Sequence, residues 1–137
     1  MKSILSLFLG LVVFCFLSSC SKKVPDGVIV STPTPVLEID TLTDMGIFEG
    51  PYYKKFVNID FRNTGDTLLH ILKVIPECDC TEVSVNDTIL PPGAVGTITA
   101  YLDLSDYPFG ENRKQFAILS DSRGKKVTYV TLIGTKN

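Results

Sequence analysis

The sequence contains no tryptophan and a single histidine, His70, among its 137 residues. General acid–base catalysis and multi-histidine metal sites usually need histidine, although carboxylates can also serve in both. The chain shows no Ser-His-Asp order, no Gly-rich phosphate loop and no pair of carboxylates in an apolar setting. These absences predict a protein that is not an enzyme and that holds no cofactor.

Positive charge is also scarce. Thirteen basic residues stand against fifteen acidic ones, the net charge is −2, and no long basic run occurs. A nucleic-acid-binding protein normally carries a basic patch or stripe, so we expect no nucleic-acid partner.

The chain begins with Met1-Lys2-Ser3, and an apolar run follows over residues 4–17. A membrane-spanning helix needs about 20 apolar residues, so this shorter run fits the hydrophobic region of a signal peptide. Leu17-Ser18-Ser19-Cys20 follows and resembles the bacterial lipoprotein box, in which small residues precede the cleavage point and the cysteine thiol takes up diacylglycerol. The sequence predicts a lipoprotein signal peptide over residues 1–19 and lipidation of Cys20, with an uncleaved anchor helix as the alternative.

Residues 20–35 are interpreted as the lipidated cysteine and a tether. Thr32-Pro33-Thr34-Pro35 favours polyproline II, and the segment has no repeating apolar face. Ser21 occupies the position where an aspartate would resemble an inner-membrane retention signal. We therefore expect attachment through the lipid to the cell envelope, at the outer membrane, and leave the leaflet open.

Residues 36–137 have the periodicity of β-strands. Short alternating segments are separated by turn residues, as in an immunoglobulin-like sandwich, and no segment after residue 20 has a helical period. The sequence predicts one all-β domain, an antiparallel β-sandwich of about seven strands. The segments with strand character are 37–39, 45–50, 53–61, 67–75, 82–85, 97–102, 114–120 and 126–133.

One of these segments predicts an irregularity. Leu69 and Ile71 share one strand parity, whereas Val74 has the other. A β-bulge next to Lys73 places all three apolar side chains inside and the lysine outside. Pro76 cannot donate to a ladder, so we expect regular pairing to end there.

Several short motifs follow one another in a recognisable order. They are Ile59-x-Phe61-x-Asn63-Thr64-Gly65, Leu69-x-Ile71-x-x-Val74, Cys78-x-Cys80-Thr81, Pro92-Gly93, Gly96-x-Ile98, Asp103, Gly110 and Leu132-x-Gly134. Together they resemble the bacterial domain-of-unknown-function family fifteen seventy-three, which is common among envelope lipoproteins and similar to the Hydin-type immunoglobulin-like β-sandwich. The resemblance covers roughly residues 36–134 and implies fold and location; because that family has no settled activity, it implies no reaction.

Cys78 and Cys80 allow three interpretations. They are small structural thiols at the sheet margin, a disulfide, or ligands of a soft metal such as copper or zinc. Residues two apart in a strand have Cα atoms about 6.6 Å apart, close to the upper limit of about 6.8 Å for a bridge, so a disulfide needs a local bend. Asp79, where the family usually has glycine, or Glu77 offers oxygen ligands, whereas His70 is expected to face solvent.

Three Asp-Thr-apolar sequences resemble the O-glycosylation acceptor of some Gram-negative envelopes, with Thr41, Thr67 and Thr88 as the candidate sites. Asp-Thr is also a common turn pair, which is the competing interpretation.

From these observations we expect a non-catalytic, lipid-anchored envelope protein whose sandwich binds a protein partner through a sheet face or an exposed edge. The alternative function is thiol redox or copper and zinc handling through Cys78 and Cys80. Glycan binding ranks last, because no aromatic platform is visible.

Overall fold

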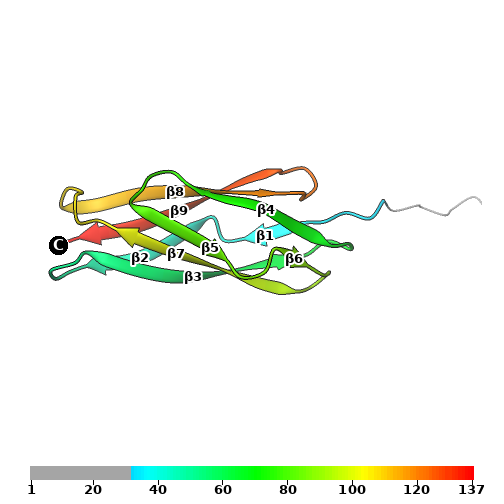
Figure 1. The fold of residues 1–137 in the computed structure, drawn as a ribbon, viewed down its shortest axis with the longest axis horizontal. Helices are drawn as coiled ribbons and strands as arrows, with labels where there is room; N and C mark the ends of the chain where they lie inside the picture. The colour runs from blue at the N-terminus through cyan, green and yellow to red at the C-terminus, as the bar shows by residue number, and fades with distance from the viewer. Residues whose placement is uncertain (1–31) are drawn as a thin grey trace, which may run out of the picture. The chain divides into compact units, whose positions relative to one another are not determined.

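The computed structural model describes residues 32–137, and these form two β-sheets packed face to face (Figure 1). The signal peptide over 1–19, Cys20 and most of the tether lie outside the described residues, so lipidation stays a prediction. The described part of the chain contains no helix with the length and hydrophobicity that a membrane span requires.

Residues 32–137 form nine strands, of which β1 and β6 are very short. The four-stranded sheet has the order β1-β3-β7-β5, and the five-stranded sheet has the order β2-β9-β8-β4-β6. The predicted all-β sandwich is confirmed, and it contains in addition β6, a two-residue strand that is not among the predicted segments. The strands are β1 (Leu37–Ile39), β2 (Leu42–Phe48), β3 (Lys54–Asn63), β4 (Leu69–Pro76), β5 (Thr81–Val85), β6 (Ile89–Leu90), β7 (Val95–Asp103), β8 (Gly110–Ser120) and β9 (Val127–Lys136).

One pairing departs from the antiparallel pattern. β2 runs parallel to β9, with Leu42 opposite Thr131 and Phe48 opposite Lys136. Only Asp40 and Thr41 separate β1 from β2, although these strands belong to different sheets. The chain therefore passes directly from the four-stranded sheet to the five-stranded sheet through these two residues.

The core lies between the sheets and is built from alternate residues of the long strands, as their periodicity predicts. Each fully buried aliphatic or aromatic side chain contributes about 1.5–3 kcal/mol, so these positions supply most of the driving force for folding. The buried hydrophobic residues are Met45, Phe48, Ile59, Phe61, Leu69, Ile71, Leu90, Ile98, Ala100, Leu102, Leu104, Phe116, Ile118, Val130 and Leu132.

The predicted bulge in β4 is confirmed. The register with β8 shifts between Ile71 and Lys73, and Leu72 and Lys73 are both exposed. Val74 consequently returns to the inner side and packs against the core. Pro76 is the last residue of the strand.

A buried side-chain amide explains the Asn63-Thr64-Gly65 motif. The side chain of Asn63 is fully buried, and its Nδ2 donates to the carbonyl oxygens of Thr67 (2.7 Å) and Leu90 (2.9 Å). Its Oδ1 accepts the amide of Gly65 (3.0 Å). A Cβ at Gly65 would lie 2.7 Å from the backbone nitrogen of Val36, so the close approach of two backbones requires glycine there.

Candidate functional site

One of the two outer strands of the four-stranded sheet is β5, which pairs with β7 on one side only. Two backbone hydrogen bonds bracket this pairing. The amide of Asp103 donates to the carbonyl of Cys80 (2.9 Å), and the amide of Asn86 donates to the carbonyl of Thr97 (3.1 Å).

These two bonds fix which backbone groups of β5 remain available. Residues that face each other in an antiparallel pair alternate between bonded and non-bonded positions. Glu82 and Ser84 therefore bond to β7, and the N–H and C=O groups of Val83 and Val85 point away from it. We call these outward groups of Val83 and Val85 the β5 edge.

The neighbouring edge of the five-stranded sheet, at β4, offers fewer backbone groups to an added strand. β6 covers β4 only at Leu69 and His70, so the rest of β4 has no strand beside it on that side. Ile75 pairs with Ala117 of β8. The backbone of the next residue, Pro76, faces the unpaired side, where proline has no N–H group to donate. The β5 edge is thus the better hydrogen-bonding surface of the two.

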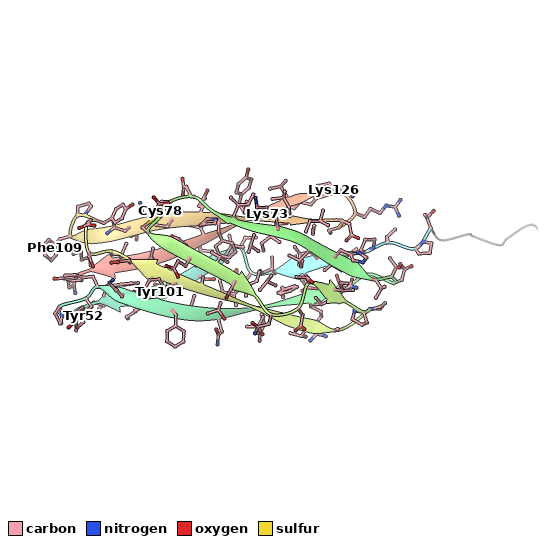
Figure 2. All side chains as sticks on the ribbon, in the orientation of Figure 1. Tyr52, Lys73, Cys78, Tyr101, Phe109 and Lys126 are labelled. Carbon is pink, nitrogen blue, oxygen red and sulfur yellow. A yellow bond between two sulfur atoms is a disulfide. The ribbon has the colours of Figure 1, made fainter. Side chains whose placement is uncertain are left out.

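Apolar and aromatic side chains accompany the β5 edge. Val83 and Val85 are half-buried and pack against the core. On the outer face of the sheet, Phe56 stands beside Tyr101, and the Phe56 side chain is 72% exposed. A groove of about 330 Å³ lies there, and Tyr101 can be located in Figure 2. Its lining residues are Phe56, Glu82, Val83, Ser84, Thr99 and Tyr101.

Cys78 and Cys80 lie immediately before β5 and are joined by a disulfide, with their Cα atoms 5.2 Å apart. The short separation arises because the chain turns here, and the amide of Thr81 donates to the carbonyl of Cys78 (3.1 Å). The hydroxyl of Thr81 lies 3.6 Å from one sulfur and 3.7 Å from the other. This turn supplies the bend that a Cys-x-Cys bridge requires.

An acidic groove surrounds the bridge. Its volume is about 750 Å³, and it lies toward the end of the sandwich that carries Tyr52 and Phe109 (Figure 2). No group of three or more histidine, cysteine or acidic residues within residues 32–137 is arranged to hold a metal ion. The groove is lined by Glu77, Cys78, Asp79, Cys80, Asp103, Asp106 and Tyr107.

Asp103 is the most constrained carboxylate of this groove. Hydrogen bonds from Ser105 lower its pKa and outweigh the opposing effect of burial, and the ion pair with Lys54 (3.0 Å) lowers it further. Asp103 is therefore ionised and partly neutralised, whereas Glu77, Asp79 and Asp106 are exposed to solvent.

The other residues singled out in the sequence, His70 and the three candidate O-glycosylation threonines, do not line the groove around the disulfide. His70 is on β4, and its Nδ1 lies 2.6 Å from Oδ2 of Asp121, a partner that sequence reasoning did not find. Thr41 and Thr88 are exposed in connections and Thr67 is half-buried before β4, so O-glycosylation stays a prediction. The sequence predicts binding at an exposed edge but does not identify β5 as that edge. Its exposure becomes apparent only from the pairing with β7, a strand distant in sequence.

Comparison with known proteins gives a family match and a set of similar folds. The family model described as "Protein of unknown function (DUF1573)" matches residues 41–135. No curated protein sequence matches the chain.

The solved structures that resemble this one include the following three. A protein of unknown function from Porphyromonas gingivalis W83 has a TM-score of 0.69 at 17% identity, covering 79% of this chain and 50% of that chain. VesB protease from Vibrio cholerae has a TM-score of 0.59 at 15% identity, covering 72% and 31% respectively. The ASH / PapD-like domain 7 of human CEP192 has a TM-score of 0.52 at 12% identity, covering 81% and 92%.

At these identities the likenesses show the fold alone, an immunoglobulin-like or PapD-like β-sandwich. The chain spans half the length of the Porphyromonas gingivalis protein. The resemblance to VesB covers less than a third of that protease and transfers no activity.

Proposed function

We propose that this chain, which belongs to the family described as "Protein of unknown function (DUF1573)", is a lipid-anchored, non-catalytic interaction domain of the cell envelope. It binds a protein partner by adding an extended strand of that partner to the β5 edge. The observation that carries the proposal is the pairing of β5 with β7 alone, which leaves the outward backbone groups of Val83 and Val85 without a partner strand.

The chemistry of this edge fits an extended peptide. In strand addition, main-chain hydrogen bonds provide affinity and pockets for alternate side chains provide specificity. Four main-chain groups of Val83 and Val85 are available, and each hydrogen bond contributes about 1 kcal/mol net. Because this hydrogen-bond contribution is modest, binding of the strand also needs apolar contacts. The groove beside Phe56 and Tyr101 supplies them.

The attachment point supports a particular orientation. The carbonyl of Pro35 accepts the amide of Arg123 (2.8 Å), and that of Thr34 accepts the amide of Asp66 (3.1 Å). Residues 32–35 therefore join the sandwich at the end that carries Lys126, while Cys78 and the start of β5 lie toward the other end (Figure 2). The start of β5 therefore lies away from the end at which residues 32–35 enter the sandwich.

Metabolic labelling with palmitate tests the anchor. We expect the native chain to take up label and the Cys20→Ala variant to lose both the label and its sedimentation with membranes. Absence of label, or label that persists in Cys20→Ala, refutes lipid anchoring and leaves the binding site to be tested separately.

Site-specific photo-cross-linking in the native envelope tests the binding site. A cross-linking residue at Glu82, exposed on β5, is compared with one at Glu38, exposed on β1 at the opposite edge of the same sheet. We expect a discrete protein product from position 82 and none from position 38.

Two variants make this test specific. Val83→Pro removes an outward N–H without touching the β5–β7 ladder and is expected to abolish the product. Asn86→Ala alters an exposed side chain directly after β5, outside the groove, and is expected to leave the product unchanged. Equal products at positions 82 and 38, or a product that survives Val83→Pro, contradict strand addition at this edge.

A second candidate function, thiol redox chemistry, is favoured by the bridge between Cys78 and Cys80.

A further inference from the structure

We infer that the Cys78–Cys80 disulfide is an accessible site of thiol–disulfide exchange, and that the carboxylates around it favour reaction with thiols that carry no additional negative charge. This inference goes beyond partner binding and does not depend on the β5 edge being occupied.

Accessibility follows from where the bridge lies. Both cysteines line the groove of about 750 Å³, between the exposed residues Glu77 and Asp79 and the connection after β7. Neither cysteine is fully buried. A thiol in solution therefore reaches the sulfur atoms without passing through the core.

The fold does not need this disulfide to stay closed. A bridge stabilises the folded state mainly by closing a loop in the unfolded chain, and the effect is smallest for the shortest loops. Here the cysteines are two positions apart in sequence. The turn is also held by backbone hydrogen bonds, from Thr81 to Cys78 (3.1 Å), from Asp103 to Cys80 (2.9 Å) and from Glu77 to Gln115 (3.0 Å). We therefore expect the reduced protein to keep its β-structure.

The electrostatic environment of the bridge is negative. Asp103 is neutralised in part by Lys54 (3.0 Å), and no ion pair within residues 32–137 involves Asp79 or Asp106. The carboxylate of Glu77 accepts the amide of Gln115 (3.1 Å) and keeps its charge close to the groove.

Two further cations lie near this groove. Nζ of Lys114 sits 3.6 Å from the centre of the Tyr107 ring. Nζ of Lys136 donates to the carbonyls of Ser105 (2.7 Å) and Tyr107 (2.8 Å), on either side of Asp106. The four carboxylates that line the groove outnumber these two lysines and Lys54, and the remaining negative charge repels anionic reagents.

An external thiol is the reductant in the exchange reaction. Its thiolate attacks one sulfur of the bridge, the S–S bond breaks, and the displaced cysteine thiolate takes a proton from water. A second external thiolate then attacks the mixed disulfide and releases the other cysteine. Two electrons pass to the protein, which gains two thiols, and the reductant leaves as its own disulfide.

Three small thiols of different charge test the inference. The folded protein is incubated with cysteamine, 2-mercaptoethanol or 2-mercaptoethanesulfonate, free thiols are trapped with N-ethylmaleimide, and the products are counted by intact mass. We expect cysteamine to react about five-fold faster than the sulfonate after correction for thiolate concentration. This ratio should approach one at about 1 M salt, where charges are screened beyond about 3 Å.

Variants assign the effect to the groove. Asp79→Asn combined with Asp106→Asn is expected to remove most of the discrimination, while Asp87→Asn, at an exposed position after β5, leaves it unchanged. Circular dichroism recorded during reduction should show an intact β-sheet signal.

Two results overturn the inference. In one, the bridge is reduced only as the sheet signal is lost, so that the disulfide is structural. In the other, the charge of the thiol or of the groove has no specific effect. The three thiols then react at equal corrected rates, or Asp87→Asn changes the cysteamine-to-sulfonate rate ratio as much as the double variant does.

Discussion

At the scale of single residues, the amide of Asn63 joins parts of the chain that are distant in sequence. Its side chain bonds to Thr67 in the turn after β3 and to Leu90 in β6, and its backbone amide donates to the carbonyl of Ala94 (3.1 Å). Within residues 32–137 no buried side-chain nitrogen or oxygen lacks a hydrogen-bond partner. Asn63 thus ties the β3–β4 turn to β6 and to the segment before β7.

Replacing this amide is expected to be costly. Asn63→Ala leaves the carbonyls of Thr67 and Leu90 without their side-chain donor, and we expect the free energy of unfolding to fall by about 3 kcal/mol. Asn58→Ala, on the exposed face of the same strand, should change it by less than about 0.5 kcal/mol. Urea unfolding of the two variants measures both values, and similar losses contradict this role of Asn63.

A second residue-scale prediction concerns pH. Burial acts to raise the pKa of Asp121, but the backbone N–H (2.9 Å) and ring (2.6 Å) of His70 more than offset it, so the pKa lies below the ordinary value of 3.8. A carboxyl group whose pKa is lower in the folded state stabilises the fold above its unfolded pKa. That contribution is lost as the pH falls through the folded pKa.

We therefore expect the native chain to be more stable than Asp121→Asn near neutral pH, with the difference closing below about pH 4. Urea unfolding over a pH series measures it. A difference that is constant across the series shows that the Asp121 carboxylate is not the origin of the effect.

At the scale of elements, the sequence predicts best what is decided locally. Alternation of apolar residues is visible along β3, β7, β8 and β9, and the parity change between Ile71 and Val74 reveals the bulge in β4. The parallel pairing of β2 with β9 is not predictable in this way, because it depends on which strand lies beside β2 in space. The same reason hides the β5 edge: only the register with β7 identifies Val83 and Val85 as outward-facing.

The docking of β1 depends on one close approach, which gives an element-scale prediction. In Gly65→Ala the new Cβ meets backbone atoms of the segment before β1, which cannot move aside as a flexible side chain can. We expect a loss of about 1–3 kcal/mol in stability and faster amide exchange in β1. Gly93→Ala has open space but a positive φ of 77°; it should leave β1 exchange unchanged.

Should Gly65→Ala and Gly93→Ala give the same exchange rates throughout β1, the close approach at Gly65 does not hold that strand.

At the scale of the whole molecule, the sandwich has two different ends. Residues 32–35 join it beside the 121–126 turn, and the Cys78–Cys80 bridge with its acidic groove lies toward the other end (Figure 2). The strand that begins at this bridge is β5. The proposed binding edge therefore begins beside the proposed exchange site, away from the end that residues 32–35 join.

Strand addition requires that β5 has an unoccupied edge, and residue-resolved amide hydrogen exchange of the purified protein measures this. With the edge free, the amides of Val83 and Val85 exchange quickly, while those of Glu82 and Ser84, bonded to β7, are protected. Protection of Val83 and Val85 as strong as that of Glu82 and Ser84, in the absence of any partner, would show that the edge is already covered and would rule out strand addition there.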